Sequence, residues 1–514
     1  MSFNQVLKSL VWLSVLSASG AGADGVKLTI LHTNDHHGHV LKSESGVGGV
    51  AARATLVEKI RTEVKQAGGH VLLLDAGDVN SGTAISNLLK AEPDFRAMKL
   101  LGYDAMTIGN HEFDVPLAAL IKQREWAGFP FLSANIEILG TDKNEVPWIP
   151  YLIKTVGDKK IALLGLTTAE TPLVSHPDKV RGYQFNSPVE IAKKLVPTLE
   201  EKADYIIALT HLGYYGEEGA PLEVESDVDL AKSAPGIDLI IGGHSHTALF
   251  QPARHHNIPI FQAGEYGKYL GRIDLQLNDD RMEVVSSELI PIDDKDGAIS
   301  ESPAMLKSLE PLIAQSKPVL EVQIGTLGAP GLDGNRNVVR SRASAIGTLI
   351  AQAFRETLRL DVGLMNGGGI RSSFKAGNVT HGDLISVLPF PDSLVVVIMS
   401  GEEISQYLKF VLENFRVEGS GSFPHLSGVS ATFKEGKVVD LKIDGKAIDS
   451  QKKYHLGLPE FLAKGGDKYP MLSDKKGYSK TGYTSGQALT EFWERKKTIQ
   501  PEEWEKAAEE TLER

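Results

Sequence analysis

The chain has 514 residues, 42% of them hydrophobic, and contains no cysteine. This length exceeds what one hydrophobic core usually organises, so we expect two domains. The formal net charge is −12 at pH 7, and no cluster of Lys or Arg stands out. This balance excludes the basic surface that binding to nucleic acid requires, although a local arginine pocket can still bind a small anion.

The first residues have the layout of a secretory signal. Lys8 precedes an apolar run from Leu10 to Leu16, and small residues follow up to Ala23. The run is far shorter than the roughly 20 apolar residues that a membrane-spanning helix needs. We therefore predict that residues 1–23 are a signal peptide cleaved after Ala23. The mature protein is expected in the periplasm without a membrane anchor, because the chain lacks a cysteine that could carry a lipid.

Residues 26–302 alternate short apolar runs with helical stretches, which predicts an α/β domain. Several runs contain Val, Ile, Leu and Ala without alternation, a pattern typical of strands that are covered on both faces. We expect two packed sheets flanked by helices. The predicted strands are Lys27–Leu31, His70–Leu74, Ala105–Ile108, Phe131–Ala134, Lys160–Leu166, Tyr205–Thr210, Leu239–Ile241 and Pro259–Gln262.

Five of these strands run into side chains that can bind a metal ion. The first is followed by Asp35 and His37, which would point to the same side of an extended segment. The other four are followed by Asp78, Asn110, His211, and the pair His244 and His246. Each residue alone is equally well explained as a structural His or a capping Asp. Ligands bind beyond the carboxyl ends of strands in open α/β sheets, so the repetition predicts a metal site, and the preceding glycines would let the backbone approach an ion.

His111 and Asp114 follow the third of these strands and are three residues apart, a spacing that places both on one helical face. An Asp that is hydrogen-bonded to a ring nitrogen fixes the tautomer of a His and favours its cationic form. Such a cation stabilises charge on a transferring phosphoryl group. The alternative is that Asp114 only caps the helix that follows.

Ala304–Ser316 is predicted to be an amphipathic helix that ends before Pro318. Its apolar side would be formed by Met305, Leu306, Leu309 and Leu312. The first sequence pattern stops here and a second one begins. We therefore predict a first domain at residues 24–302, a linker helix at 303–318 and a second domain at 319–514.

The second domain contains arginines and glycines around a helix predicted at Ser344–Arg359. Arg336 and Arg340 precede this helix, and a Gly-rich turn between Asn366 and Arg371 follows it. Guanidinium groups bind phosphate oxygens with two parallel hydrogen bonds. A Gly-rich turn alone is weak evidence for a ligand site, since most such turns bind nothing.

The order of these polar segments resembles that of the calcineurin-like dinuclear metallophosphoesterases. The segments Leu-His-Thr-Asn-Asp-His-His-Gly-His and Gly-Asn-His-Glu-Phe-Asp resemble the bacterial periplasmic 5′-nucleotidase/UDP-sugar hydrolase family, and the resemblance covers nearly the whole mature chain. It implies a metallophosphoesterase β-sandwich flanked by helices, an interdomain helix and a C-terminal α/β domain that binds the substrate. It also implies two divalent ions (Zn, Mn or Co), the first bound by Asp35, His37, Asp78 and His246 and the second by Asp78, Asn110, His211 and His244.

The same resemblance implies that His111 and Asp114 are catalytic. The implied substrate-binding residues are Arg336, Arg340, Asn366, Arg371, two rings that sandwich the base, Phe390 and Phe461, and a carboxylate for the ribose, Asp467. Stacking of a base on an aromatic ring is worth about 1–3 kcal/mol. Without the resemblance, both rings would be read as core residues. The chain departs from the family pattern at His246, where some members have Gln, at Asp392, where relatives can have Asn, and at Lys468, where Gly is usual.

The implied function is hydrolysis of nucleoside 5′-monophosphates, and also of UDP-sugars and other 5′-nucleotides, by a monomer. A 2′,3′-cyclic-nucleotide 2′-phosphodiesterase/3′-nucleotidase or a thiosulfate-ester hydrolase on the same scaffold is the alternative with similar chemistry. A non-catalytic two-domain periplasmic binding protein is the alternative from another class, and it would lack an ordered metal set. His32, His36 and His39 are expected either to support the ligands from behind or to be structural, because the implied ligands already complete both metal sites.

Overall fold

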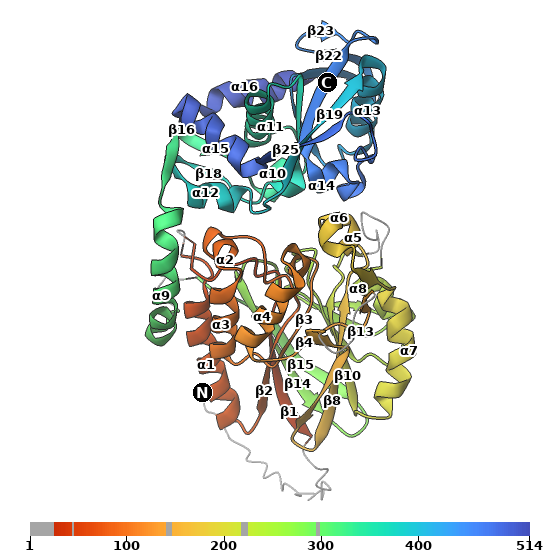
Figure 1. Ribbon diagram of the computed structural model, residues 1–514. Coiled ribbons are helices and arrows are strands. Elements are labelled where there is room, and N and C mark those ends of the chain that lie inside the picture. Colours follow the sequence, from red (N-terminus) through yellow and green to blue (C-terminus); the bar gives the residue numbers. More distant parts are fainter. Residues whose placement is uncertain (1–24, 44–45, 140–145, 217–224, 294–298, 514) are drawn as a thin grey trace, which may run out of the picture.

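The computed structural model describes residues 25–43, 46–139, 146–216, 225–293 and 299–513, so the predicted signal peptide lies outside the described residues. Two lobes lie one above the other, and helix α9 (Pro303–Leu320) runs along one side of the first lobe and leads up to the second (Figure 1). Within these ranges, no helix combines the length and the apolar character needed to cross a membrane.

The first lobe is built on two sheets. In its described part, the first sheet has the strand order β15-β14-β1-β2-β3-β4-β6, in which β1, β2, β3, β4 and β6 run parallel and β14 pairs antiparallel with both β1 and β15. The bounds are β1 (Val26–Thr33), β2 (His70–Asp75), β3 (Ala105–Thr107), β4 (Phe131–Leu132), β6 (Trp148–Ile149), β14 (Tyr269–Leu277) and β15 (Met282–Pro291).

The second sheet of this lobe has the order β12-β13-β11-β10-β8-β7. Its central strands β8, β10, β11 and β13 are parallel, and the two edge strands are antiparallel to their neighbours. The bounds are β7 (Tyr151–Val156), β8 (Lys159–Thr167), β10 (Tyr205–His211), β11 (Leu239–Ile241), β12 (Ala253–His255) and β13 (Ile258–Phe261). A small ribbon pairs β5 (Ile136–Ile138) with β9 (Tyr183–Phe185).

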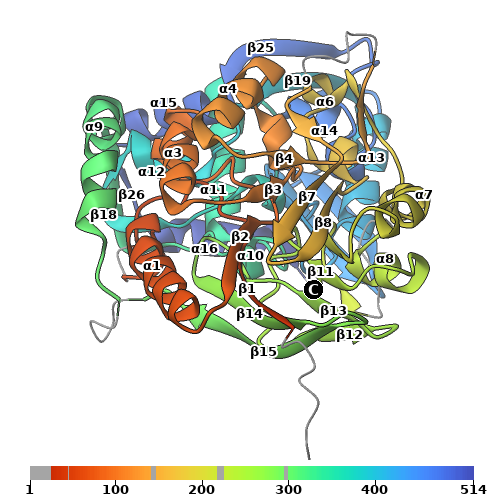
Figure 2. The ribbon, with the colours of Figure 1, turned by 90° about the horizontal axis from the view of Figure 1, so that it is seen from below.

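The two sheets pack face to face between two layers of helices, as the view from below shows (Figure 2). Leu72 and Leu74 of β2 face the core between the sheets, whereas Leu73 faces the helices. Both faces of the strand are therefore buried, which explains its unbroken apolar run. The helices on the first sheet are α1 (Val50–Gln66), α3 (Glu92–Leu101) and α4 (Leu117–Ala127), and those on the second are α7 (Pro188–Glu200) and α8 (Asp227–Ser233).

The predicted sandwich flanked by helices is therefore confirmed, and each of the eight predicted strands occurs within about two residues of its expected bounds. Among the strands of six or more residues in this lobe, sequence reasoning missed β7, β14 and β15. Side chains of β15 alternate between half-buried and exposed, because this strand lies at the sheet edge. An edge strand of this kind carries no continuous apolar run that would mark it as buried.

Helix α9 is longer than predicted, and one residue of its predicted apolar side is exposed. It continues to Leu320 although Pro318 lies in its last turn. Pro318 lacks the N–H that would bond to the carbonyl of residue 314, and it is exposed. Met305 and Leu309 are buried, but Leu306 is 37% exposed. It lies one position from Met305, about 100° around the helix, and so leaves the packed face.

The second lobe contains a central sheet with the order β20-β17-β24-β19-β25. Its strands are β17 (Val362–Asn366), β19 (Ser393–Ser400), β20 (Pro424–Ser427), β24 (Lys453–Pro459) and β25 (Tyr478–Thr484). The predicted helix at Ser344–Arg359 is α11 (Ala345–Leu358), with Ser344 as its N-cap. Further helices are α10 (Arg336–Val339), α12 (His381–Val387), α13 (Gly401–Asn414), α14 (Glu460–Ala463), α15 (Ser485–Lys496) and α16 (Pro501–Thr511).

Two smaller sheets complete this lobe. One has the order β18-β16-β26 and the other β23-β22-β21-β27. The bounds are β16 (Gln323–Leu332), β18 (Phe374–Thr380), β21 (Val429–Lys434), β22 (Lys437–Ile443), β23 (Lys446–Ala447), β26 (Thr498–Ile499) and β27 (Leu512–Glu513).

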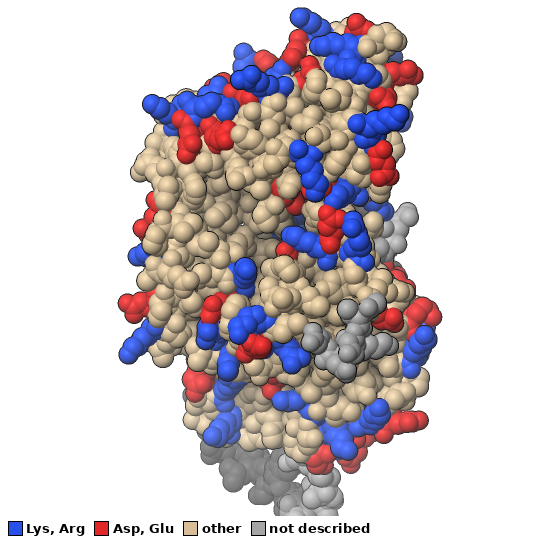
Figure 3. All heavy atoms as spheres, in the orientation of Figure 1, with Lys and Arg blue, Asp and Glu red and all other residues tan. Residues whose placement is uncertain are grey.

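The lobes touch on both sides of a central cavity. On one side α12 packs against α2 (Ala84–Leu88) and α9, and the Asn87 side chain donates a hydrogen bond to the carbonyl of Pro389 at 3.3 Å. On the other side α5 (Thr171–Val174) and α6 (Pro177–Val180) face the second lobe (Figure 1). Lys464 forms an ion pair there with Asp178. On the face drawn in Figure 3, basic and acidic side chains are interspersed and form no continuous basic patch.

Candidate active site

The candidate ligands lie where the parallel strands of both sheets end. Strands β1, β2 and β3 of the first sheet and β10 and β11 of the second each run into one of the polar segments found in the sequence. These ends meet because the two sheets pack face to face. Within the described residues, side chains that could hold a metal form the groups Asp35–His37–His246, His37–Asp78–His111 and Asp78–His211–His244, each with its ligand atoms within 4.8 Å of one another.

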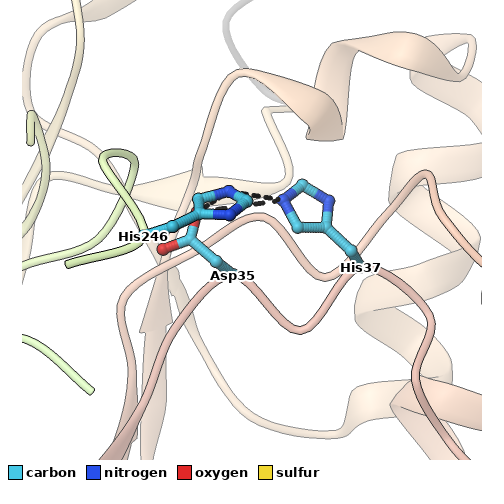
Figure 4. Close-up of side chains that lie close together, drawn as sticks. All are labelled: Asp35, His37 and His246. Atoms are coloured by element: carbon cyan, nitrogen blue, oxygen red, sulfur yellow. Dashed lines mark hydrogen bonds and ion pairs between the residues drawn. The ribbon is translucent and has the colours of Figure 1, made fainter. Parts of the chain in front are cut away.

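The first group is centred on two histidines. The Nε2 atoms of His37 and His246 lie 3.2 Å apart, and Oδ1 of Asp35 lies 3.3 Å from Nε2 of His246 and 3.9 Å from Nε2 of His37. Figure 4 shows the two rings turned toward each other beside the carboxylate. Asp35 and His37 are almost completely buried.

The second group is joined to the first through Asp78. Oδ2 of Asp78 lies 3.0 Å from Nε2 of His211 and 3.8 Å from Nε2 of His37. Nδ1 of His244 lies 2.9 Å from Oδ1 of Asn110. The structure therefore brings together all seven residues that were expected to bind metal, with Asp78 between the two groups.

The backbone reaches this arrangement differently from the sequence-based expectation. Asp35 and His37 have φ values of 49° and 47°, so the segment is not extended and the prediction of an extended segment was wrong. Asp78, His244 and His246 are also left-handed, with φ values of 58°, 79° and 60°. Such conformations cost about 1–3 kcal/mol each and are found mainly at functional sites, where the surrounding structure imposes them.

Glycines allow the loops to approach one another closely. A Cβ atom on Gly109 would lie 2.2 Å from Oδ1 of Asp78, and one on Gly243 would lie 2.7 Å from the carbonyl oxygen of Ala76. Gly77 has a φ of 87°, a left-handed conformation that favours glycine. A larger residue at Gly109 or Gly243 would push these loops apart, as expected for glycines that precede ligands.

The hydrogen bonds of the first group show whether a cation fits there. Nδ1 of His37 lies 3.0 Å from the carbonyl oxygens of Asn80 and Ser81, and Nδ1 of His246 lies 2.8 Å from Oε2 of Glu265. These partners only accept, so in the neutral form of each ring Nδ1 carries the proton and Nε2 carries a lone pair. Two lone pairs that face each other at 3.2 Å repel unless a cation lies close to both.

The second group also favours a positive charge beside its carboxylate. Nδ1 of His211 donates to the carbonyl of Ala76 at 2.7 Å, and its Nε2 faces Oδ2 of Asp78 at 3.0 Å. Burial lowers the pKa of His211, but the carboxylate of Asp78 outweighs this effect and raises that pKa to about 10. This site therefore favours a positive charge. Imidazole nitrogen and carboxylate oxygen atoms are the ligands that divalent transition metals prefer.

His111 and Asp114 form a pair beside the two groups. They begin and end the short 3-10 helix η1 (His111–Asp114), and Nδ1 of His111 lies 2.6 Å from Oδ2 of Asp114. Burial lowers the pKa of His111, but the carboxylates of Asp114 and Asp78 outweigh this effect and raise it. The following helix α4 begins after Pro116 and has no side-chain cap, so the alternative that Asp114 caps it is wrong.

The cavity between the lobes has a volume of about 370 Å³. The first lobe contributes Asp78, Asn110 and His111 to its wall. The second lobe contributes every residue that was expected to bind substrate, namely Arg336, Arg340, Asn366, Arg371, Phe390, Phe461 and Asp467. The metal-ligand groups and these residues therefore face one space.

Comparison with known proteins identifies this architecture. Residues 28–248 match the family model of the calcineurin-like phosphoesterases, and residues 323–474 match that of the 5′-nucleotidase C-terminal domain. The chain is 41% identical over 502 residues to Protein UshA of Salmonella pullorum, covering 91% of this chain and 90% of that protein. The chain belongs to the 5′-nucleotidase family of calcineurin-like phosphoesterases. Its calcineurin-like fold implies divalent metal ions.

Two further members of the 5′-nucleotidase family match this chain over nearly its whole length. A 5′-nucleotidase of Vibrio cholerae is 38% identical over 527 residues, covering 95% of this chain and 94% of that protein. The crystal structure of a 5′-nucleotidase precursor from Thermus thermophilus superimposes with a TM-score of 0.80 at 28% identity, covering 92% of this chain and 97% of that one. The predicted family resemblance is therefore confirmed for both lobes.

The charges in the part of the cavity that the second lobe lines favour an anionic ligand that also carries polar groups. Burial lowers the pKa of Arg340, and the nearby Arg336 and Arg371 lower it further, which indicates an excess of positive charge. Asp467 accepts a hydrogen bond from Nδ2 of Asn366 at 2.7 Å, and burial raises its pKa to about 6. Burial also raises the pKa of Asp392 to about 6.

The two aromatic rings of the cavity differ in their surroundings. Phe390 lies nearly parallel to the ring of His111, with centroids 5.6 Å apart and planes 19° apart. The guanidinium of Arg371 lies 5.9 Å from the same ring. Phe461 is 9% exposed and lies against Gly466. A base that stacks on the His111 side of Phe390 therefore has to displace the contact between the lobes.

Sequence reasoning missed three carboxylates that organise the site. Glu112 accepts hydrogen bonds from the backbone N–H groups of Gly109, Asp78 and Val79 at 2.7, 3.0 and 2.9 Å, and so ties two ligand loops together. Its position inside the motif Gly-Asn-His-Glu could have indicated this role. The other two, Glu170 and Glu265, lie outside every motif, and only the fold brings them to the histidines.

None of the three other histidines of the first motif belongs to the groups of described side chains that could hold a metal. His36 lies 3.2 Å from a carboxylate oxygen of Asp94, and the ring of His39 stacks on Tyr266 with centroids 4.3 Å apart. His32 packs with its edge against Phe261.

Proposed function

We propose that the protein is a two-metal phosphohydrolase that releases phosphate from nucleoside 5′-monophosphates, with UDP-sugars and other 5′-nucleotides as further substrates. One observation carries the proposal: members of both ligand groups, the pair His111–Asp114 and the arginine and phenylalanine side chains all face one cavity. Membership of the 5′-nucleotidase family makes the protein a nucleotide phosphohydrolase.

The first ion would be held by Asp35, His37, Asp78 and His246, and the second by Asp78, Asn110, His211 and His244. When bound, two divalent ions lower the pKa of a water molecule and neutralise phosphoryl oxygens. Zn, Mn and Co all suit ligands of this kind, and availability decides among them.

The side chains around the ions have separate tasks. Nδ1 of His111 is engaged by Asp114, so its Nε2–H is left to donate to a phosphoryl oxygen and to stabilise charge there. The guanidinium groups of the second lobe orient the phosphate. Phe390 and Phe461 hold the base by stacking, which accepts any base, and Asp467 accepts hydrogen bonds from the ribose hydroxyls.

We also infer a periplasmic location and a monomeric state. The location is supported by the predicted signal peptide at residues 1–23, and fractionation of the cells that produce the protein tests it. The monomer is expected because both lobes of one chain line the cavity. Sedimentation of the purified protein tests this expectation.

A panel of substrates tests the function. The purified protein, treated with a chelator and then supplied with Zn, Mn or Co, is incubated with AMP, UDP-glucose and 2′,3′-cyclic AMP. We expect phosphate from AMP only after a divalent ion is restored, because the cation is needed to neutralise the phosphoryl oxygens. A thiosulfate ester is included as a fourth compound. Faster turnover of the cyclic nucleotide or the thiosulfate ester than of AMP would favour that alternative, and full activity after metal removal would contradict the metal-dependent mechanism.

Replacing Phe461 by Leu tests whether this ring binds the base by stacking. Leu preserves apolar volume in the core but offers no planar face, so we expect the KM for AMP to rise about tenfold, which corresponds to about 1.4 kcal/mol of lost stacking. The rate with p-nitrophenyl phosphate, which has no nucleoside, should stay unchanged. Phe250→Leu is the matched control, because Phe250 is 56% exposed and lies outside the cavity wall. An equal loss with both substrates would mean that Phe461 only supports the fold.

A further inference from the structure

Two carboxylates lie directly behind the two histidines that follow β11. Oε2 of Glu170 lies 2.9 Å from Nε2 of His244, and Oε2 of Glu265 lies 2.8 Å from Nδ1 of His246. The two histidines are two residues apart, yet their carboxylates engage opposite nitrogens of the imidazole ring. A carboxylate only accepts hydrogen bonds when ionised, so each one fixes a different tautomer.

The tautomers decide which atom each ring presents to the candidate metal centre. His244 is protonated at Nε2 and turns Nδ1 toward Asn110, 2.9 Å away. His246 is protonated at Nδ1 and turns Nε2 toward His37 and Asp35, at 3.2 and 3.3 Å. One ring therefore serves the group around Asn110 and the other the group around Asp35.

Both carboxylates are held in place by further contacts. Glu170 is 8% exposed, and its backbone N–H donates to Oγ1 of Thr168 at 3.1 Å. The second oxygen of Glu265 accepts from Nζ of Lys268 at 2.6 Å. That lysine keeps Glu265 charged and leaves its other oxygen for His246. The two carboxylates come from unrelated parts of the chain, one after β8 and the other before β14.

We propose that Glu170 and Glu265 are positioning residues, one for each metal ion, that set which ring nitrogen His244 and His246 present. The inference rests on the proposed two-metal centre. A carboxylate behind a ligating histidine orients the ring and makes the ligand atom more basic, and its loss typically lowers metal affinity about 10- to 100-fold. Each loss should concern one ion and leave the other unchanged.

The experiment measures metal affinity rather than turnover. Chelator-treated protein is titrated with Zn²⁺ in competition with a chromophoric chelator, for the wild type, Glu170→Gln, Glu265→Gln and the control Glu125→Gln. Glu125 is 58% exposed and pairs with Lys122 on α4. We expect two ions in the wild type and the control. Each of the other two variants should bind one ion about 10- to 100-fold more weakly, with an unchanged melting temperature of the metal-free protein.

A second set of variants assigns each carboxylate to its histidine. In a His246→Ala background, Glu265→Gln should have no further effect on zinc affinity, whereas Glu170→Gln should still weaken the remaining ion. In a His244→Ala background the order should be reversed. Wild-type affinities in both single Gln variants, or a Glu265→Gln deficit that persists without His246, would overturn the inference while the two-metal centre stands. A wild-type protein that binds fewer than two zinc ions would overturn the centre itself and the inference with it.

Discussion

Replacing Asp78 by Asn is expected to lower kcat for AMP at least about a thousandfold. Oδ2 of Asp78 faces Nε2 of His211 and, more distantly, Nε2 of His37, and Oδ1 accepts from the backbone N–H of His111 at 2.8 Å. Asn preserves the shape but removes the one negative charge that both ligand groups share. Loss of metal-ion stabilisation is worth several kcal/mol, and each 1.36 kcal/mol is a factor of ten in rate.

The measurement combines steady-state kinetics with elemental analysis of the bound metals. Asp104→Asn is the matched control, because it makes the same chemical change at the opposite end of β3, where Asp104 accepts from the backbone N–H of Leu73 and pairs with Lys154. The control should retain wild-type activity and metal content. If Asp78→Asn released phosphate at the wild-type rate with two ions bound, Asp78 would not be the shared ligand.

Replacing His111 by Ala should lower kcat about 10²- to 10⁴-fold while both ions stay bound. This is the range contributed by a positioned acid–base group. His111 lies at the cavity wall and its side chain is 12% exposed, so the substitution leaves the ligand groups intact. A loss of metal together with activity would instead assign His111 to the metal centre, where it lies near His37 and Asp78.

Asp114→Asn is the companion variant, and its effect depends on pH. The carboxylates of Asp114 and Asp78 raise the pKa of His111 against the effect of burial. Without the charge of Asp114, burial remains and the pKa of His111 falls. Because the protonated ring is the active form, the alkaline limb of kcat/KM should move to lower pH. An alkaline limb that stays in place or moves to higher pH would contradict the role of Asp114.

Several features could be predicted because they depend on local pattern. A strand such as β2 must be apolar at every position when both of its faces are buried, and this leaves a continuous run in the sequence. Parallel strands place their carboxyl ends at one edge, so the residues after each run converge whatever the details of the loops. The positions of Asp35, Asp78, His211 and His244 in one site followed from this rule.

Other features have no local signal. The half-exposed edge strand β15 carries no continuous apolar run, and the left-handed backbone of Asp35 and His37 is imposed by neighbouring loops that bond to it. The backbone N–H of Asp35 donates to the carbonyl of Gly77 at 2.9 Å, and that of His37 to the carbonyl of Asp78 at 3.0 Å. A prediction made from the sequence of one segment cannot include hydrogen-bond partners that lie in another segment of the chain.

The sequence by itself determined the two-domain α/β architecture, the metal-ligating residue types and the position of each after a strand, since these depend on side-chain chemistry and on the order of elements along the chain. Only the tertiary structure decided which ring nitrogen each histidine presents, how Glu112, Glu170 and Glu265 support the ligands, and that His111 of one lobe faces Phe390 of the other. These relations join residues from tens to hundreds of positions apart. Their partners are selected by packing, which no local pattern records.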